Sequence, residues 1–274
     1  MTDPISTSAS TDSVFIAGIL GAVQGATEFL PVSSSAHLIV VSWMMEGKPL
    51  PLSMNVALHV GTALAVLAYF WKDWLNLARD LLLRIFRGTR SFGADKLAPA
   101  LVLGSLPAAV IGILWQDQIE AKLHHPLIVV VPLALVGVLL WWGDRRSPST
   151  RKINDLTLRD AILIGLAQAS ALFPGVSRSG ATILVGRILQ FKREDAARFS
   201  FLLGAPVIVG AAILNAKHLA AHAGDPVFQV GVGVSAVTGC LAIGFLLTFL
   251  RRFGFAAFMI YRVALAIVIA VIAR

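Results

Sequence analysis

Charged residues and cysteine are scarce in this chain of 274 residues. Only 14% of the residues are charged, against about 25% in typical soluble domains, and 57% are apolar. The mean hydropathy is +0.80. The single cysteine, Cys240, excludes an internal disulfide framework and is most simply a packing residue. These shortages argue against an ordinary soluble protein and against a disulfide-stabilised secreted domain.

Long apolar runs take the place of the missing charge. A helix needs about 20 apolar residues to cross the hydrocarbon core of a bilayer. A soluble protein with buried helices is the alternative, but it would not contain so many runs of this length. We therefore predict an all-α polytopic membrane protein. Six stretches meet or approach the required length: 53–71, 97–115, 126–142, 199–219, 227–250 and 254–273.

Acidic residues are fewer than basic ones, 15 against 23, which gives a net charge of +8. The lysines and arginines gather in a few loops between apolar runs, as they do on the cytoplasmic side of membrane proteins. We therefore predict no nucleic-acid partner. Residues 1–13 form a polar tail without a basic residue, so we expect no cleaved signal peptide. Residues 14–274 are predicted to form a single membrane domain.

Two segments that start 144 positions apart, 17–41 and 161–185, repeat each other without gaps. They read AGILGAVQGATEFLPVSSSAHLIVV and AILIGLAQASALFPGVSRSGATILV. Their polar residues differ, because the first copy carries a carboxylate and an imidazole and the second carries a guanidinium. We therefore predict that both copies contribute to one composite active site. The shared polar and structural residues are Gly21/Gly165, Gln24/Gln168, Phe29/Phe173, Val32/Val176, Ser33/Ser177 and Ser35/Ser179.

Each copy is broken by proline, glycine and serine after about a dozen mostly apolar residues. Helices end near prolines, and irregular backbone at membrane depth survives only inside protein or beside a cavity. Both copies are therefore predicted to be re-entrant helical hairpins. Three spans between them would place the hairpins on opposite faces. The predicted fold is six transmembrane helices plus two re-entrant hairpins in an inverted repeat, 14–142 and 160–273.

The positive charges predict the orientation. Sixteen of the 23 lysines and arginines lie in the loops 72–96, 145–159, 192–198 and 251–252. This face is therefore predicted to be cytoplasmic, with both termini outside. Within 72–96 the apolar residues recur at helical spacing, which predicts either an amphipathic helix on the membrane surface or a solvated linker helix. The opposite face would hold Lys48, Lys122, Lys217 and Arg274, and Arg178, Arg187 and Arg262 fall within apolar segments.

The first break places a carboxylate, three hydroxyls and an imidazole close together in the chain. Glu28 lies one helical turn after Gln24, so the two side chains share a face. A carboxylate at membrane depth is costly, which favours a metal ligand or an acid–base group over a helix-end carboxylate. The residues Ser33, Ser34 and Ser35 lead into a helix N-terminus, a natural anion site, and His37 follows one turn later.

The second break repeats this plan with an arginine. Arg178 offers a planar fork of donors that suits phosphate oxygens. It is flanked by Ser177 and Ser179, and Gly175 permits close approach of the backbone. The two breaks together predict a phosphate site.

Other polar residues give weaker signals. Arg262 follows Tyr261 in the last apolar stretch and is interpreted either as a second phosphate contact or as the partner of a carboxylate. His59 and Asn55 are interpreted as hydrogen-bonded packing residues.

At these breaks the chain resembles the undecaprenyl-diphosphate phosphatases, the bacitracin-resistance membrane phosphatases. The family motif (E/Q)GxTEFLPVSSTGH is similar to residues 24–37, and PGxSRSG matches 174–180. The similarity continues through LHVGTALAVLAYFW, AARFSFLLGAP and the terminal YR. Gln24 stands where many members have glutamate, Ser35 replaces threonine, Ala36 replaces glycine and Asn55 stands where an acidic residue is common.

The resemblance implies hydrolysis of undecaprenyl diphosphate in the bacterial inner membrane, which recycles the lipid carrier of peptidoglycan synthesis. Ser34 would be the nucleophile with His37 as its base, or His37 or Glu28 would activate water. Glu28 and Gln24 would hold Mg²⁺ or Ca²⁺, or Glu28 would orient His37. Membrane lipids and a second copy of the chain are further expected partners. A transporter or flippase of a lipid phosphate is the alternative function. Phosphate would be bound by Arg178, Ser33, Ser35, Ser177, Ser179, Gly175 and Arg262.

Overall fold

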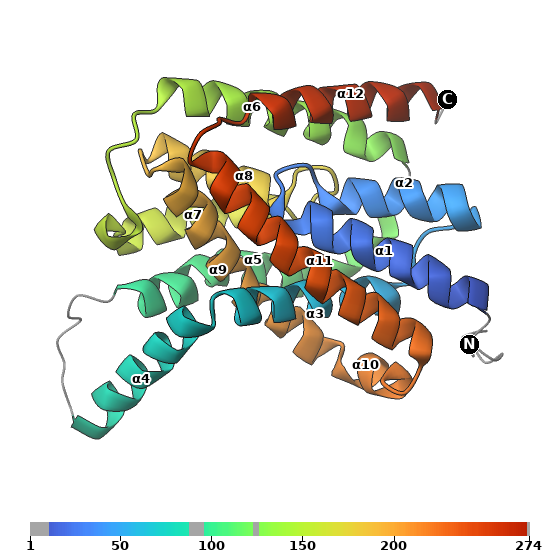
Figure 1. Cartoon of the computed structure of the whole chain (residues 1–274), viewed down its shortest axis with the longest axis horizontal. Coiled ribbons are helices and arrows are strands. Elements are labelled where there is room, and N and C mark those ends of the chain that lie inside the picture. The colour runs from blue at the N-terminus through green and yellow to red at the C-terminus, as the bar shows by residue number, and fades with distance from the viewer. Residues whose placement is uncertain (1–10, 88–95, 123–125, 273–274) are drawn as a thin grey trace.

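The computed structural model describes residues 11–87, 96–122 and 126–272, and it is helical throughout (Figure 1). Apart from one isolated bridge, these residues form no β-structure. The predicted polar tail lies mostly outside the described residues, as do Arg90 and Arg274 of the charge distribution. The α-helices are α1 Thr11–Phe29, α2 Ser34–Glu46, α3 Leu52–Tyr69, α4 Trp71–Arg87, α5 Leu97–Lys122, α6 Val130–Arg146, α7 Leu158–Ser170, α8 Arg178–Ile188, α9 Arg193–Leu214, α10 Ala216–His222, α11 Pro226–Leu250 and α12 Ala256–Ile272, with short 3₁₀ helices η1 Pro126–Val129 and η2 Ile153–Asp155.

Five segments of the described chain have the length and apolar character of a membrane span. They are α3, α5, α9, α11 and Leu127–Arg146, and they correspond to five of the six predicted stretches. The sixth corresponds to α12, which is apolar but has 17 described residues. Helix α9 begins at Arg193, six residues before the predicted stretch, because Glu194 and Asp195 in its first turn favour a helix N-terminus. The chain thus has the architecture of a polytopic helical membrane protein.

Two helix pairs turn back on themselves, α1 with α2 and α7 with α8 (Figure 1). The helices of each pair are separated by a few residues around Pro31 and Pro174. Both turns lie near the centre of the molecule, whereas the open ends of the two hairpins lie at opposite ends of it (Figure 1). The two halves of the predicted site therefore come from opposite sides and meet in the middle.

A glycine shared by both sequence copies lets each hairpin pack closely against a neighbouring helix. A Cβ on Gly21 of α1 would lie 2.6 Å from the carbonyl oxygen of Gly231 in α11. A Cβ on Gly165, the equivalent residue of α7, would overlap the carbonyl of Gly104 in α5. Only glycine permits this backbone approach, so the same repeat position docks each hairpin against a long helix.

The order of elements repeats as well. Helices α1 to α6 and α7 to α12 each form a hairpin, a long helix, a peripheral helix and two further helices. The contacts follow this order, since α1 packs on α11 and α7 packs on α5. By the same correspondence, the interface of α3 with α11 is the counterpart of the interface between α9 and α5.

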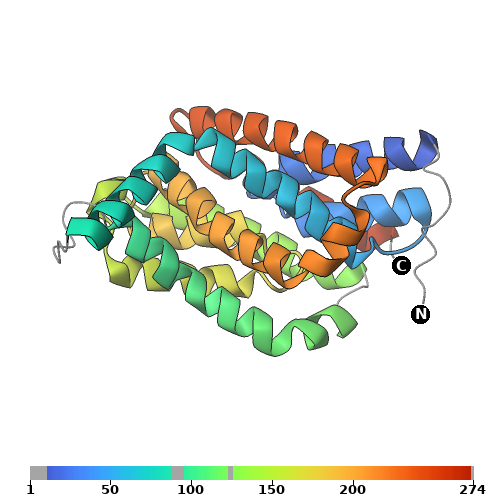
Figure 2. The same cartoon turned by 90° about the horizontal axis from the view of Figure 1, so that it is seen from below.

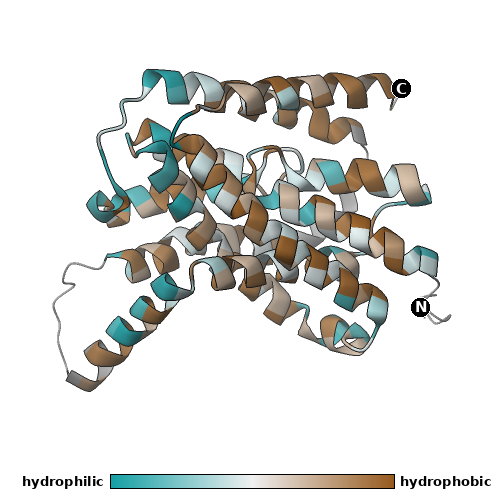
Figure 3. Ribbon diagram, in the orientation of Figure 1, coloured by the Kyte–Doolittle hydropathy of each residue, from teal (hydrophilic) through white to brown (hydrophobic). Residues whose placement is uncertain are grey.

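Hydrophilic residues gather at the end of the molecule where α6 stops and α9 begins (Figure 3). There Arg187 of α8, which is 1% exposed, donates to Asp144 of α6 across 2.8 Å, and Arg193 donates to the same carboxylate. A buried charge needs such a partner.

The amphipathic helix predicted after residue 71 is present as α4, which projects from the bundle (Figures 1 and 2). Its position at a membrane surface stays a prediction.

Candidate active site

The second helix of each hairpin starts from a strained serine at the same repeat position. Ser33 precedes α2 with φ 74°, and Ser177 precedes α8 with φ 71°. Residues with a side chain rarely adopt this left-handed region, and such strain often marks functional sites. Ser177 also caps α8, because its hydroxyl accepts a hydrogen bond from the amide of Gly180 at 3.1 Å.

The serines predicted to bind phosphate form two matching pairs. The hydroxyls of Ser33 and Ser35 lie 3.1 Å apart, and those of Ser177 and Ser179 lie 3.2 Å apart. Each pair stands at the N-terminus of a helix, where free amides favour an anion. The breaks are thus built alike, as the sequence repeat predicted.

The two breaks also bind each other directly. The amide of Gly175 donates to the hydroxyl of Ser35 at 3.3 Å, and the hydroxyl of Ser179 donates to the carbonyl of Leu30 at 3.1 Å. Gly175 has φ 89°, and a Cβ there would lie 2.6 Å from the carbonyl oxygen of Val129. These crossed contacts join the hairpins into one site.

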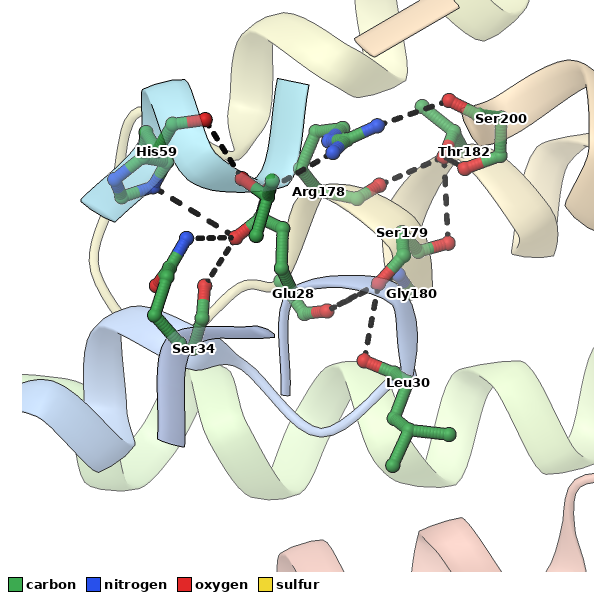
Figure 4. A network of polar contacts seen from close by, with 12 residues as sticks. Glu28, Leu30, Ser34, His59, Arg178, Ser179, Gly180, Thr182 and Ser200 are labelled. Atoms are coloured by element: carbon green, nitrogen blue, oxygen red, sulfur yellow. Dashed lines mark hydrogen bonds and ion pairs between the residues drawn. The ribbon is translucent and has the colours of Figure 1, made fainter. Parts of the chain in front are cut away.

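Glu28 is the centre of the polar network (Figure 4). Its Oε2 accepts hydrogen bonds from the Ser34 hydroxyl at 2.6 Å and from the Gln24 amide at 3.1 Å. Its Oε1 accepts from Nη2 of Arg178 at 2.8 Å. The side chain of Glu28 is only 6% exposed, so the arginine supplies the charge compensation that burial requires. The carboxylate and the hydroxyl of the first break are therefore in direct contact with each other, and the carboxylate also contacts the guanidinium of the second break.

Arg178 is aimed at Glu28 by helix α9. Its Nη1 donates to the carbonyl of Ser200 at 2.9 Å, and the Ser200 hydroxyl is 2.6 Å from that of Thr182. The guanidinium lies over Gly204, where a Cβ would overlap it. This dependence on Gly204 was not predicted, although the residue lies in the AARFSFLLGAP segment noted above.

His37 does not contact Ser34 or Glu28 through any described hydrogen bond. Its Nδ1 lies 2.7 Å from the carbonyl of Ser33, so this nitrogen donates. Its Nε2 then accepts from the hydroxyl of Tyr261 at 2.6 Å, and the two rings are stacked. The geometry therefore does not support the prediction that His37 is the base for Ser34. Instead, the imidazole is hydrogen-bonded to the backbone of Ser33, the strained residue that precedes Ser34.

His59 lies beside Glu28, a position that was not predicted for it. Its Nδ1 donates to the carbonyl of Asn55 at 2.8 Å, and its Nε2 lies 3.7 Å from Oε2 of Glu28 (Figure 4). The His59 side chain is 30% exposed. Its interpretation as a packing residue is therefore incomplete, because the ring faces the site. The signal was present in NVALHVGT, in which Asn55 and His59 are one helical turn apart.

Arg262 is fully buried, and all its nitrogens are engaged by backbone carbonyls. It therefore clamps both breaks to the start of α6. Among the described residues its partners are carbonyls rather than the predicted carboxylate, and a phosphate contact stays a prediction. The acceptors are the carbonyls of Leu133 at 2.7 Å, Pro31 and Gly175 at 3.0 Å, Val176 at 3.1 Å and Pro132 at 3.4 Å.

A cavity of about 260 Å³ adjoins the network. Glu28, His59 and Arg178 reach it from three different elements, and Gln168, the counterpart of Gln24, lies on its wall. The rest of the lining is mostly apolar. The cavity thus brings anion-binding, proton-accepting and apolar groups together, which suits a lipid-linked phosphate. Its other lining residues are Asn55, Val56, Ala108, Ala171, Leu172, Gly204, Val207, Ile208 and Ala211.

The described residues contain no group of three or more histidine, cysteine or acidic side chains that could hold a metal ion. Glu28 and Gln24 nevertheless offer oxygen ligands. The amide of Gln24 uses its nitrogen on Glu28, which leaves its buried Oε1 without a hydrogen-bond partner. Mg²⁺ is often held by one or two carboxylates together with substrate phosphates, so this donor set fits a metal bound jointly with substrate.

Known proteins are similar to this chain in sequence over almost its whole length. A model of the family described as bacitracin resistance protein BacA matches residues 17–268. An undecaprenyl-diphosphatase of Pelotomaculum thermopropionicum is 41% identical over 261 residues, covering 95% of this chain and 97% of that protein. An undecaprenyl-diphosphatase of Moorella thermoacetica is 44% identical over 257 residues, covering 94% and 97%. The undecaprenyl-diphosphatase 2 of Stutzerimonas stutzeri is 42% identical over 260 residues, covering 93% and 96%.

Proposed function

Because the chain belongs to the family of the bacitracin resistance protein BacA, we propose that it hydrolyses undecaprenyl diphosphate to undecaprenyl phosphate and inorganic phosphate. The reaction recycles the lipid carrier for peptidoglycan synthesis and confers bacitracin resistance. The observation that carries the proposal is the contact of Ser34 and Arg178 with one carboxylate, Glu28, where the two breaks meet. A transporter needs an anion site, but it has no need of a hydroxyl bound to a carboxylate.

Arg178 is the proposed anchor of the diphosphate. A phosphate oxygen that replaces Glu28 on Nη2 would keep the arginine paired and would free the carboxylate to accept a proton. The amides at the start of α2 and α8 and the hydroxyls of Ser33, Ser35, Ser177 and Ser179 are proposed as further donors, because the two breaks that carry them are in direct contact. Such a site acts mainly by positioning and by neutralising charge.

Ser34 is the proposed nucleophile, and Glu28 rather than His37 is its proposed base. As Ser34 Oγ bonds to the terminal phosphorus, its proton passes to Glu28 Oε2, which it already faces at 2.6 Å. The bond from that phosphorus to the bridging oxygen breaks, and undecaprenyl phosphate leaves. Water then attacks the phosphoserine and gives its proton to the released phosphate, while Glu28 returns its proton to Ser34.

The alternative is direct attack by water activated at Glu28 or His37. In either scheme we assign His37 a positioning role, since its Nδ1 holds the carbonyl of Ser33 next to the reacting serine. Trapping of a radiolabelled phosphoserine at residue 34 would support the covalent route, and phosphate release during which no labelled enzyme can be trapped would favour direct attack by water.

We assign a divalent cation, Mg²⁺ or Ca²⁺, to Gln24 Oε1 and Glu28. When bound, it would neutralise part of the diphosphate charge. An amide is a weaker ligand than a carboxylate, so we expect looser metal binding than a glutamate at position 24 would provide. Replacement of Gln24 by glutamate should therefore lower the concentration of Mg²⁺ needed for half-maximal binding, measured by calorimetry.

The proposed membrane arrangement is six spans plus the re-entrant hairpins α1/α2 and α7/α8 in the inner membrane, with both termini on the periplasmic side. The positive loops support this orientation. Helix α11 provides a test, because Gly224 and Arg252 lie just beyond its two ends. In a Cys240→Ser background, Gly224→Cys should react with an impermeant maleimide in intact spheroplasts, and Arg252→Cys should react only after lysis. The reverse pattern would invert the topology.

A homodimer stays a prediction, which the mass of the detergent-solubilised protein tests.

The function itself is tested by phosphate release from undecaprenyl diphosphate by the purified full-length protein, with and without a chelator. We expect release by the wild type, loss in Glu28→Gln and Arg178→Ala, and restoration of chelated enzyme by Mg²⁺ or Ca²⁺. Wild-type protein that binds the lipid but releases no phosphate would favour the transporter.

A further inference from the structure

An apolar groove of about 480 Å³ is lined mainly by α5 and α9. The two helices run side by side in the view from below (Figure 2). Its edges carry strongly exposed apolar side chains, with Ile113 67% and Ile213 68% exposed, so it opens sideways from the bundle. Pro206 lies inside α9 at its wall. The other lining residues are Leu52, Val56, Ser105, Ala108, Ala109, Gly112, Leu172, Val207, Gly210, Ala211, Leu214 and Asn215.

This groove is continuous with the polar cavity of the active site. Five residues line both spaces, and they come from α3, α5, α9 and the turn after α7. A molecule with a charged head at Arg178 and an apolar tail in the groove would therefore pass over one unbroken surface. The shared residues are Val56, Ala108, Leu172, Val207 and Ala211.

The groove breaks the repeat symmetry of the fold. Its counterpart, the interface of α3 with α11, is closely packed, and a Cβ on Gly61 would lie 2.5 Å from the carbonyl oxygen of Val232. At the α5/α9 interface, a Cβ on Gly112 or on Gly210 would meet no heavy atom within 4 Å. These two glycines are therefore not needed for helix contact. Glycine in an open helix interior costs about 1 kcal/mol relative to alanine, so their presence calls for another reason.

We propose that the groove binds the part of the prenyl chain next to the diphosphate, and that Gly112 and Gly210 keep it open. The inference rests on the proposed function and adds a specificity subsite to it. The occupant is a prenyl chain because the groove is apolar and leads directly from the phosphate-binding residues. Its open side lets the rest of a long chain continue into the bilayer.

The test fills the groove without disturbing helix contacts. Gly112→Leu and Gly210→Leu place a side chain in open space, and Gly233→Leu is the matched control, because Gly233 of α11 also has no atom within 4 Å and lines neither space. Gly112→Ala and Gly210→Ala add a smaller side chain at the same two positions and should fill less of the groove. Each purified protein is first compared with the wild type by gel filtration and by thermal melting.

We expect both leucine variants to raise KM for undecaprenyl diphosphate about 10- to 100-fold, the loss expected when a few apolar groups can no longer be buried. The alanine variants should have smaller effects, and Gly233→Leu should match the wild type. A prenyl diphosphate carrying a photoreactive group near its head should cross-link to α5 and α9, as mass spectrometry would show.

An unchanged KM in both leucine variants, or cross-links confined to other helices, would overturn the proposal and would point to a bilayer lipid as the occupant. Failure of the proposed function gives a different result. In that case wild-type protein releases no phosphate from undecaprenyl diphosphate, yet cross-linking still reports whether a prenyl chain lies in the groove.

Discussion

Arg178 donates to Glu28 across 2.8 Å, although the two residues are 150 positions apart in the chain. Each comes from a different copy of the repeated hairpin, and both are largely buried. A buried charge needs a partner, so each half of the site needs the other. The duplicated segment has thereby become two complementary halves of one centre.

Arg178→Lys tests the need for a planar fork. Arginine bonds Ser200 through Nη1 and Glu28 through Nη2 at once, and a lysine ammonium cannot reproduce that geometry. Loss of one charged hydrogen bond should lower kcat/KM for phosphate release roughly 10- to 100-fold. Wild-type turnover would mean that only the positive charge matters.

Gly204→Ala should inactivate the enzyme without unfolding it. The added methyl group overlaps the guanidinium of Arg178 and must displace it from Glu28, whereas alanine itself suits a helix better than glycine does. Phosphate release should fall to the level of Arg178→Ala, and the protein should stay folded, although separation of the buried ion pair should lower its melting temperature. Gly233→Ala serves as the control and should behave as the wild type. Full activity in Gly204→Ala would show that Arg178 works from another position.

Ser34→Ala should abolish phosphate release, because it removes the hydroxyl that faces Glu28. Ser35→Ala removes a hydroxyl from the same break without touching Glu28, so its loss should be milder. Turnover by each variant with saturating undecaprenyl diphosphate measures the difference. Equal losses would indicate that both hydroxyls only bind phosphate.

His59→Leu should lower kcat for phosphate release, because the imidazole lies 3.7 Å from the carboxylate that we propose as the base. His59→Gln should recover part of the loss, because its amide can still donate toward Glu28. His222→Leu is a matched control, since Nδ1 of His222 makes the same kind of bond to a carbonyl four residues earlier but lies outside the cavity. Unchanged kinetics in His59→Leu would return this residue to a packing role.

Arg262→Leu should destabilise the protein rather than weaken substrate binding. It leaves several buried carbonyls without a donor, and each costs about 1–3 kcal/mol. The melting temperature in detergent should fall sharply, and Arg262→Lys should restore only part of it. A stable Arg262→Leu protein with a raised KM would instead support the phosphate contact predicted from the sequence.

Much of this protein is determined by local sequence. An apolar run long enough to span a membrane predicts a helix from its own residues, and a proline ends a helix through contacts with its immediate neighbours. The long helices and the two breaks could therefore be predicted. The repeat placed Glu28, Ser34 and Arg178 at equivalent breaks, and the different polar residues of the two copies gave reason to expect one composite site. The apolar stretch predicted at 199–219 begins six residues after α9 does, because hydropathy alone does not count the charged first turn of a helix.

Only the tertiary structure decided which partner each polar group has. The directions of His37 and His59 depend on how α2 and α3 are rotated about their axes, and a sequence period does not determine that rotation against distant neighbours. Arg262 meets carbonyls from three separate segments, and Gly204 contacts Arg178 only because α9 packs against α8. Likewise, the groove between α5 and α9 results from two equivalent interfaces that pack differently, since packing depends on all facing side chains together.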